Sequence, residues 1–558
     1  MNLVQALAEV ANRGTGHGLR LFRGDEEAER VTYGELYADA GRLACGLLER
    51  GVRQGERVAI ALPTSIDFAR AFFGVLAAGA VPVPLPPPVR FASLDIHLSR
   101  IALAMRQSKV RVVLSDSTLG RLMGPVLGGA DGEFEVLDTA LVRAAGTEYA
   151  DVPDEAPGLV QYTSGTSQEP KGVVLSHANL LANVAAITKG LDVTDAEVCC
   201  NWLPLFHDMG LIGTLLTPVF NGAEALLLPP EDFLRDPGRW LRIISGYHGT
   251  ATTAPNSGYL HALRKVPADK VHGLDLSRWR VALNGAEAID PGMMRRFSEH
   301  FAPAGFHGSA FLPVYGLAEG SLAVTFAPLG RRSAKTIWVR REPLADGVVE
   351  PVSPEAGDTA SARELVSVGV PVANTEVRLV DDDGAVLSGE ARVGEIQIRG
   401  DSVMRAYEAD EAATRATVHA GGWVSTGDVA LRRDGELFIV GRTKEMIIIF
   451  GQNYHASDIE SVAGRVPGVA NNAVLAMAVA TADGEGLALV AETKEADPAV
   501  RAQLVGQLRH AVSDAIGISP HDVILVRRGT LPRTSSGKLQ RYGTEALVTA
   551  EDGDGASR

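Results

Sequence analysis

Short apolar runs alternate with amphipathic stretches through the first part of the chain. Thr32 followed three positions later by Glu35 has the spacing of a capping box, which predicts that a helix begins there. The apolar runs at 58–62 and 80–85 predict strands on either side of an amphipathic helix at 65–78. Because both strands are almost wholly apolar, we expect a parallel sheet that is buried on both faces. This pattern indicates an α/β fold.

The pattern changes twice farther along the chain. Residues 376–380 and 393–399 alternate apolar and polar positions around a turn at 381–384, which predicts a hairpin in a β-rich unit. From about residue 444 onward, short strands and helices are mixed, which predicts a small α+β domain. The earlier stretch 341–366 is rich in Pro, Ala, Gly and acids, and we expect an inserted loop that ends in a short helix. A plain surface linker would have the same composition.

The bulk composition argues against several classes of function. A chain of 558 residues is too long for one core, and its net charge of −15 argues against nucleic-acid binding. The sequence has no apolar run long enough to span a membrane, and its N-terminus lacks the pattern of a secretory signal. Cys45, Cys199 and Cys200 lack metal-ligand spacing, so we expect buried, reduced thiols. These features are typical of a cytoplasmic enzyme.

A polar loop within residues 162–177 carries the strongest chemical signal. Short apolar runs enclose it, so we expect a strand, a loop and a second strand. Small hydroxyl residues and glycine let backbone N–H groups approach an anion, and a lysine adds a full charge, which suits polyphosphate. The loop differs from GxxxxGK[ST], because Pro170 precedes the lysine and Gly172 follows it. A polar surface turn is the alternative; the candidate ligands are Thr163, Ser164, Gly165, Thr166, Ser167 and Lys171.

Two turns that follow apolar strands carry further candidates. Residues 284–287 end a strand at 279–283, and a glycine turn at the carboxyl end of a strand is where open α/β sheets bind ligands. Within 314–319, Tyr315 offers a flat face for a purine, and Glu319 offers a hard oxygen ligand for Mg²⁺. A core tyrosine and a solvated glutamate are the alternatives.

Two polar positions and one mixed motif complete the set. Asp428 follows Ser, Thr and Gly, which predicts a turn, and its carboxylate would accept two vicinal ribose hydroxyls. A glycine beside Lys538 predicts a long, mobile cation on an exposed loop, although a solvated surface lysine is the alternative. Residues 202–210, WLPLFHDMG, mix aromatic, proline, histidine and acid as a regular core element would not. Asp208 at the start of a capped helix is the simpler interpretation of that motif.

Taken in order, these motifs resemble the adenylate-forming superfamily of acyl-CoA synthetases, fatty acyl-AMP ligases, peptide-synthetase adenylation domains and luciferases. The resemblance extends over about residues 31–541. The motif WLPLFHDMG, the proline run 86–88, Ala318 in the place of a threonine and the insert make the fatty acyl-AMP ligases the most similar branch. One departure is that Ser167 and Gln168 stand where the superfamily usually has Thr-Gly.

The resemblance implies a fold of class α/β plus α+β in three parts. Residues 1–441 would form a large N-terminal domain of doubly wound sheets with a small β-barrel-like subdomain and the insertion at 341–366. Residues 442–444 would form a hinge with Lys444 as its pivot. Residues 445–558 would form a small, mobile C-terminal domain that carries the catalytic lysine.

The resemblance also implies the roles of individual residues. Lys538, Glu319 and His207 would be catalytic: Lys538 would bridge the carboxylate and the α-phosphate, Glu319 with Thr166 would hold Mg²⁺, and His207 would stand at the mouth of an acyl pocket. That pocket would be formed by His207, Asp208, Met209, Gly210, Ala254, Pro255 and Asn256. The nucleotide would be bound by Thr163, Ser164, Gly165, Thr166, Ser167, Lys171, Gly285, Ala286, Glu287, Tyr315, Gly316, Leu317, Ala318, Asp428 and Arg442.

The implied reaction activates an apolar, fatty or related carboxylic acid with ATP and Mg²⁺, giving acyl-AMP and pyrophosphate. We expect the acyl group to pass to the phosphopantetheine thiol of a holo acyl-carrier protein, with free CoA as the alternative acceptor. Free amino acids should be poor substrates. A non-catalytic adenylate-binding relative is a further alternative, but Lys538 and Glu319 are both present, which favours an enzyme.

Overall fold

The computed structural model describes most of the chain. The described residues are 1–87, 94–121, 134–163, 170–353, 355, 361–449, 452–481, 484–533, 539–541, 544 and 547–548. The predicted ligands Ser164, Gly165, Thr166 and Ser167 of the polar loop lie outside them, and so does Lys538.

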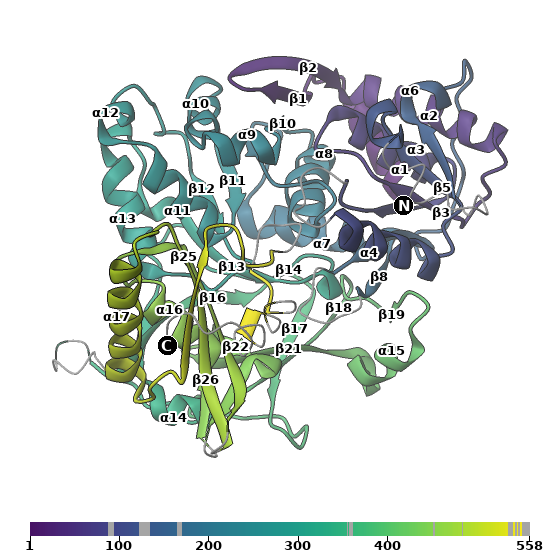
Figure 1. Ribbon diagram of the computed structural model, residues 1–558. Coiled ribbons are helices and arrows are strands. Elements are labelled where there is room, and N and C mark those ends of the chain that lie inside the picture. Colours follow the sequence, from purple (N-terminus) through teal and green to yellow (C-terminus); the bar gives the residue numbers. More distant parts are fainter. Residues whose placement is uncertain are drawn as a thin grey trace.

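A small parallel sheet forms one end of the molecule, at the upper right of Figure 1. Its described strands follow the order β4-β3-β5-β6, and all three pairings are parallel, as the apolar runs predict. The predicted capping box is present, because Thr32 and Glu35 bond each other's backbone at the start of α2. The elements are α2 (Tyr33–Glu49), β3 (Arg57–Ile60), α3 (Ile66–Ala77), β4 (Val81–Pro84), α4 (Leu94–Gln107), β5 (Val112–Ser115), β6 (Glu135–Asp138) and α6 (Thr139–Val142).

A sheet of fifteen described strands spans the centre of the molecule. Its parallel part follows the order β1-β10-β9-β11-β12-β13, with β2 antiparallel at the edge. The elements are α1 (Leu3–Arg13), β1 (Gly18–Arg23), β2 (Glu26–Thr32), α7 (His177–Leu191), β9 (Val198–Asn201), the π-helix η1 (Met209–Leu216), α8 (Thr217–Asn221), β10 (Glu224–Leu227), α9 (Pro230–Arg235), α10 (Gly238–Gly246), β11 (Ala251–Ala254), α11 (Asn256–Lys265), α12 (Ala268–Val271), β12 (Val281–Asn284), α13 (Pro291–Phe301) and β13 (Phe311–Gly316).

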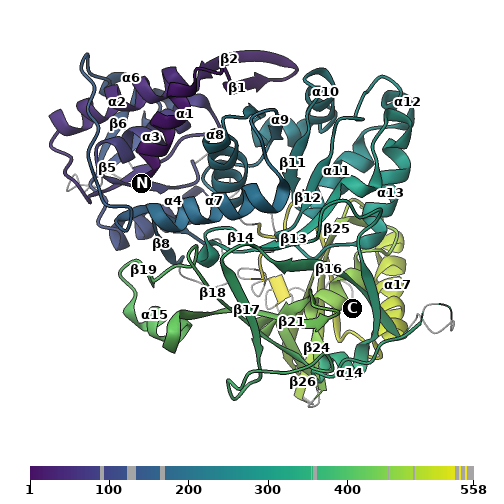
Figure 2. The same cartoon turned by 180° about the vertical axis from the view of Figure 1, so that it is seen from behind.

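Helices cover both faces of this parallel part (Figures 1 and 2). Side chains alternate between the faces along each strand. Val281 therefore belongs to the core that includes residues of α7 and η1, and its neighbour Ala282 belongs to the core that includes residues of α10, α11 and α13. The strands are therefore buried on both faces, as near-continuous apolar runs require.

The predicted β-rich unit continues the same sheet. From β13 the order runs through β14, β16, β22, β21 and β18 to β17, and these pairings are antiparallel. The predicted hairpin is present as β17 and β18, and Gly384 N–H bonds Asp381 O in its turn. The elements are β14 (Ala323–Phe326), β15 (Thr336–Arg340), α14 (Arg341–Ala345), β16 (Ala362–Pro371), β17 (Thr375–Val380), β18 (Val393–Gly400), α15 (Glu411–Thr417), β20 (Val418–His419), β21 (Trp423–Arg433) and β22 (Glu436–Arg442).

Three expectations from the sequence are wrong in detail. The insert at 341–366 begins with a helix, α14, and ends in strand β16, because that strand finds partners on both sides in β15 and β22. Asp428 lies within strand β21, where Gly427 at φ 71° and a register shift replace the predicted turn. Cys45 and Cys199 are only partly buried, whereas Cys200 is buried as expected.

The C-terminal part has separate small sheets and a core of its own, at the lower left of Figure 1. Its elements are η7 (Thr443–Glu445), β23 (Met446–Ile449), β24 (Gln452–His455), α16 (Ala456–Ala463), β25 (Val469–Thr481), β26 (Gly484–Thr493), α17 (Pro498–Ile516) and β27 (Asp522–Arg527). A third sheet joins β7 (Pro157–Tyr162) and β8 (Gly172–Ser176), the strands that enclose the polar loop, to β19 (Ala406–Tyr407). Within the described residues, no helix has the length and hydropathy needed to cross a membrane.

Candidate active site

One large cavity collects most of the predicted site residues. It has a volume of about 1370 Å³ and is bounded by the carboxyl ends of β11, β12 and β13, by β21 and β22, and by the C-terminal part. Lining residues from the prediction are Thr163, Lys171, His207, Asp208, Met209, Asn256, Ala286, Glu287, Tyr315, Gly316, Leu317, Ala318, Glu319, Asp428 and Arg442. The topology thus brings together segments that are hundreds of residues apart in the sequence.

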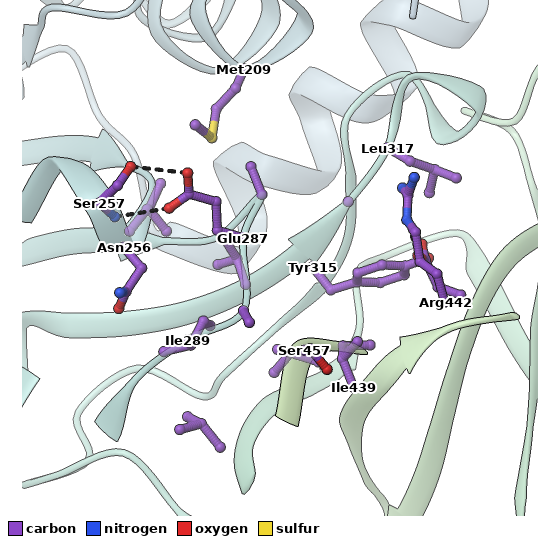
Figure 3. A pocket seen from close by; sticks show the side chains of 18 of the residues that line it. Met209, Asn256, Ser257, Glu287, Ile289, Tyr315, Leu317, Ile439, Arg442 and Ser457 are labelled. Atoms are coloured by element: carbon purple, nitrogen blue, oxygen red, sulfur yellow. Dashed lines mark hydrogen bonds and ion pairs between the residues drawn. The ribbon is translucent and has the colours of Figure 1, made fainter. Parts of the chain in front are cut away.

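Tyr315, Asp428 and Arg442 form a continuous chain of hydrogen bonds at one side of the cavity. The Tyr315 hydroxyl donates to Asp428 Oδ2 at 2.7 Å, and Arg442 Nε donates to Asp428 Oδ1 at 2.8 Å. Asp428 holds the pKa of the Arg442 guanidinium above its usual value, and burial raises that of the Tyr315 hydroxyl. Figure 3 shows Tyr315 and Arg442 from their separate strands at this wall. The two carboxylate oxygens keep lone pairs for further donors such as ribose hydroxyls.

Glu319 is held by a residue that the sequence did not reveal. Tyr407 donates its hydroxyl to Glu319 Oε1 at 2.8 Å, and the Lys171 ammonium lies over the Tyr407 ring, 4.8 Å from its centre. Burial raises the pKa of Glu319, and the Tyr407 hydrogen bond opposes that shift. Tyr407 lies in β19, which pairs with β8. Only this pairing reveals its position, because the sequence around Tyr407 carries no motif.

The turn after β12 is shaped by backbone packing. Gly285 lies so close to Val314 that an added Cβ would meet its carbonyl oxygen at 2.8 Å, and Ala286 adopts a positive φ of 64°. Glu287 accepts hydrogen bonds from the backbone N–H and the hydroxyl of Ser257, at 2.8 and 2.9 Å (Figure 3). Glu287 therefore caps the first turn of α11, in addition to lining the cavity.

His207 lies at the cavity wall just before η1. Its Nδ1 is 2.5 Å from Asp208 Oδ1, and the same oxygen accepts the backbone N–H of Met209, so Asp208 also caps the helix as expected. Gln161 Nε2 donates to Phe206 O at 3.0 Å and ties this segment to the strand that precedes the polar loop. No sequence motif points to Gln161.

Four of the predicted site residues lie behind the cavity wall and do not line the cavity. Gly210 packs against Pro204, whose oxygen would lie 2.1 Å from an added Cβ, so only glycine fits there. Ala254 and Pro255 are buried beneath the cavity wall, and Gly285 is buried behind Ala286. These positions shape the wall through backbone packing.

The cavity continues into an apolar arm between the parallel sheet and the helices α7 and η1. Within the arm, the residues from β9, β11 and β12 point to the same face of the sheet as the core shared with α7. The side chains of the arm are Ile187, Leu191, Val193, Cys199, Gly213, Thr214, Thr217, Ala251, Thr253, Leu283 and Phe326. Burial raises the pKa of the Cys199 thiol to about 12. None of these side chains is charged.

The profile of AMP-binding enzymes matches residues 9–408 of this chain. The chain belongs to the AMP-binding enzyme family. It is 34% identical to a putative acyl-CoA synthetase of Caulobacter vibrioides over 98% of this chain and 95% of that protein. It is 32% identical to the medium-chain-fatty-acid–[acyl-carrier-protein] ligase JamA of Moorena producens, over 93% of this chain and 90% of that protein. A solved structure from a study of fatty acyl-adenylate ligases of E. coli and L. pneumophila matches with a TM-score of 0.91 and 31% identity, covering 99% of both chains.

This AMP-binding enzyme is therefore an ATP-dependent adenylate-forming ligase, and it is similar in fold to fatty acyl-AMP ligases. The described residues contain no cluster of three or more His, Cys, Asp or Glu side chains arranged to hold a metal ion. A single carboxylate such as that of Glu319 would suit Mg²⁺, which is usually bound by one or two carboxylates together with phosphates and water.

The C-terminal part of the AMP-binding enzyme contributes cavity-lining residues that come before and after Lys538 in the sequence. Arg533 and Leu539 both line the cavity, and Lys538, which lies between them in the sequence, is outside the described residues. Arg541 donates to Glu460 Oε1 at 2.5 Å and pairs with Glu445 at 3.0 Å. Burial raises the pKa of Glu460 to about 7. The predicted pivot Lys444 has its backbone in η7, and its side chain is outside the description.

Proposed function

We propose that this ligase activates an apolar carboxylic acid to acyl-AMP and passes the acyl group to the phosphopantetheine thiol of an acyl-carrier protein. One observation carries the proposal. A single cavity joins a polar wall, formed by Tyr315, Asp428, Arg442 and Glu319, to an uncharged apolar arm. The polar wall suits a nucleotide, and the apolar arm suits an acyl chain.

The residue roles follow from this geometry. Tyr315 presents its ring to adenine, and Asp428 with Arg442 holds the ribose. Glu319 would hold Mg²⁺, and the metal would supply positive charge at the phosphates. The loop from Thr163 to Lys171 binds the β- and γ-phosphates. These groups position the acid for attack on the α-phosphate, and little covalent chemistry by the protein is needed.

Lys538 completes the site from the C-terminal domain, residues 445–558. Its cation bridges the carboxylate and the α-phosphate and stabilises the charge that develops in the transition state. After adenylation, rotation about the hinge at 442–444 removes Lys538 and admits the thiol. The cavity-lining positions of Arg533 and Leu539 support its placement near the reaction.

The acid is apolar because the arm offers no group to pair with an α-ammonium. Near the mouth, Asp208 is engaged by His207 and by the Met209 N–H, and Glu287 is engaged by Ser257. An amino acid would therefore bury an unpaired charge, which is strongly unfavourable. Fatty acids and related aryl-alkanoic acids carry no ammonium group, so they would bury no such charge.

The identity of the acyl acceptor is the most specific part of the proposal. Its support is the relative JamA, named as a ligase to an acyl-carrier protein, and the insert at 341–366. The Caulobacter vibrioides relative is named as a putative acyl-CoA synthetase, so free CoA is the competing acceptor.

Two measurements test the proposal. Pyrophosphate release across a panel of fatty, aryl-alkanoic and amino acids, with acyl-AMP identified by mass, tests the first step. Preferential activation of a free amino acid would contradict the apolar assignment. For the second step, one tube holds CoA and another holds holo acyl-carrier protein. Efficient acyl-CoA formation without loading of the carrier would reverse the choice of acceptor.

A further inference from the structure

The deep end of the apolar arm lies at the amino-terminal edge of the parallel sheet. Ala251, the first residue of β11, pairs with Cys199 on β9 and with Val281 on β12. Ala251 and Cys199 both line the cavity, together with Leu191 and Val193 from the end of α7 and the residues after it. The arm thus runs along the full length of β11, from the active-site end to the opposite edge of the sheet.

A charged cluster lies directly behind this deep end. Arg280 donates to the backbone oxygens of Leu191 at 2.9 Å and Asp192 at 3.2 Å, and its Nε donates to Glu197 Oε1 at 2.9 Å. Thr250, the residue before β11, donates its hydroxyl to the other oxygen of Glu197. Glu197 is only 8% exposed. One guanidinium therefore ties the end of α7 to the residues before β9 and β12.

From these contacts we infer that the arm is closed at this end, and that Ala251 and Leu191, held in place by Arg280, set the longest acyl chain the enzyme accepts. The inference rests on the proposed function, since it concerns the acid bound in the same cavity. Ala251 forms the floor on the sheet side. Leu191 forms it on the helix side, and the carbonyl of Leu191 is one of the groups that Arg280 holds.

The length of the arm limits the length of the acyl chain that it can hold. From Ala251 to Ala254 the strand advances three residues, or about 10 Å, and an extended chain advances about 1.2 Å per bond, so the arm accepts about eight bonds. The carboxyl group and the first carbons lie beyond the strand ends, beside His207. Acids of about eight to twelve carbons should therefore be the best substrates, with a steep fall in activity beyond that length.

Two variants should move this limit in opposite directions. Ala251→Val adds bulk to the floor, and it should lower kcat/KM for the longest good acid roughly tenfold or more while hexanoic acid changes about twofold or less. Arg280→Ala frees the end of α7, and it should raise kcat/KM for acids just beyond the normal limit about fivefold or more.

A matched control separates pocket shape from loss of stability. Ala282 lies on the neighbouring strand β12, faces the opposite side of the sheet and is completely buried in the core with α11 and α13. Ala282→Val adds the same bulk outside the arm, so it should lower the melting temperature and leave the chain-length profile unchanged.

The assay measures pyrophosphate release by the full-length protein with saturated acids from hexanoic to palmitic acid. A shorter limit in Ala251→Val and a longer one in Arg280→Ala, with the parental profile in Ala282→Val, would support the closed floor. If apolar acids are activated but the limit is the same in the parent, Ala251→Val and Arg280→Ala, the floor is assigned wrongly and the proposed function stands. If the parent activates no apolar acid, both the floor and the proposed function are wrong.

Discussion

The two ends of the central cavity are built by different means. At the polar wall, side chains hold one another: Asp428 binds Tyr315 and Arg442, and Glu319 binds Tyr407. In the apolar arm, the side chains make no such network. Their arrangement comes from the faces that strands β9, β11 and β12 turn toward α7. A polar group must be paired when it is buried, whereas an apolar lining needs only shape.

This difference implies that changes at the two ends should have separate effects. A change in the hydrogen-bonded wall should alter the use of ATP for every acid. A change in the arm should alter the choice among acids and leave the use of ATP nearly constant. The predictions below test this separation, beginning with the residue expected to act on both substrates at once.

Lys538→Ala should affect the use of both ATP and the acid, because this lysine is proposed to contact both the acid and the α-phosphate. We expect adenylation to fall by about 10²–10³-fold, the loss typical of one transition-state charge contact of about 3–4 kcal/mol. The measurement is single-turnover acyl-AMP formation. Lys494→Ala, an exposed lysine of the same domain, is the matched control. Acyl-AMP formation near the parental rate in Lys538→Ala would remove the lysine from the mechanism.

The polar wall could be predicted from the sequence to a large extent, because each of its groups sits in a short motif with its own chemistry. Tyr315 and Glu319 follow an apolar strand, and Asp428 follows Ser-Thr-Gly. Tyr407 could not be predicted, because its place depends on the pairing of β19 with β8 across more than two hundred residues. Local signals specify a ligand, but only the tertiary pairing shows which side chain supports it.

The apolar arm and the insert show what the sequence could not provide. Ala251 and Ala282 are both small residues in short strands, and only the packed sheet shows that one lines the arm and the other does not. In the insert, the stretch expected to end as a helix became strand β16, because β15 and β22 provide hydrogen-bonding partners on both sides. Tertiary context overrides local propensity at such places.

Asp428→Asn should act on the nucleotide end alone. It keeps the shape of the side chain but removes the charge that Arg442 and Tyr315 contact. A hydrogen bond to a charged group contributes about 1.5–3 kcal/mol, so we expect kcat/KM for ATP to fall about 10–100-fold. The KM for the acid and the chain-length profile should remain near those of the parent. Asp383→Asn, at an exposed turn, is the control. A changed preference among acids would contradict the separation of the two ends.

Tyr407→Phe should have a smaller effect, because it weakens the carboxylate of Glu319 that is proposed to bind Mg²⁺. The variant keeps the ring beneath Lys171 but removes the hydroxyl that donates to Glu319. That hydrogen bond favours the ionised carboxylate and opposes the effect of burial, so its loss raises the pKa of Glu319 further. The acidic limb of the pH–rate profile should therefore move to higher pH. At slightly acidic pH, kcat/KM should fall about 2–10-fold and recover partly as the pH rises.

The measurement is a pH profile of adenylation at two concentrations of Mg²⁺. Because a proton and the metal compete for the same carboxylate, high Mg²⁺ should restore part of the activity at low pH. A uniform loss at every pH and Mg²⁺ concentration would show that Tyr407 acts only on the fold around β19 and β8.

Transfer of the acyl group to the acceptor should depend on charged residues that lie outside the cavity. The chain carries a net charge of −15, so it repels an acidic carrier protein at long range and needs a local basic patch to bind one. In the C-terminal part, Arg541 is engaged by Glu445 and Glu460 at the cavity wall and is not part of an exposed patch. Arg527 and Arg528 at the end of β27 are exposed.

The position of Arg528 supports a patch that crosses from the C-terminal part to the large domain. The pKa of His261 on α11 is lowered by burial and, further, by the nearby charges of Lys265, Arg528 and Arg264. Cations from two parts of the chain therefore lie near enough to His261 to lower its pKa.

Reversing Arg527 and Arg528 to Glu should slow loading of holo acyl-carrier protein about 2–5-fold at low salt, with acyl-AMP formation unchanged, because rim charges act mainly on the association rate. The difference from the parent should shrink as salt rises and screens the attraction. Reversal of the exposed pair Arg332 and Arg415, on the large domain, provides the same change in net charge as a control. Equal slowing in both double variants would mean that net charge alone governs the encounter. Slowing only in the Arg527 and Arg528 variant would place the carrier beside the end of β27 and α11.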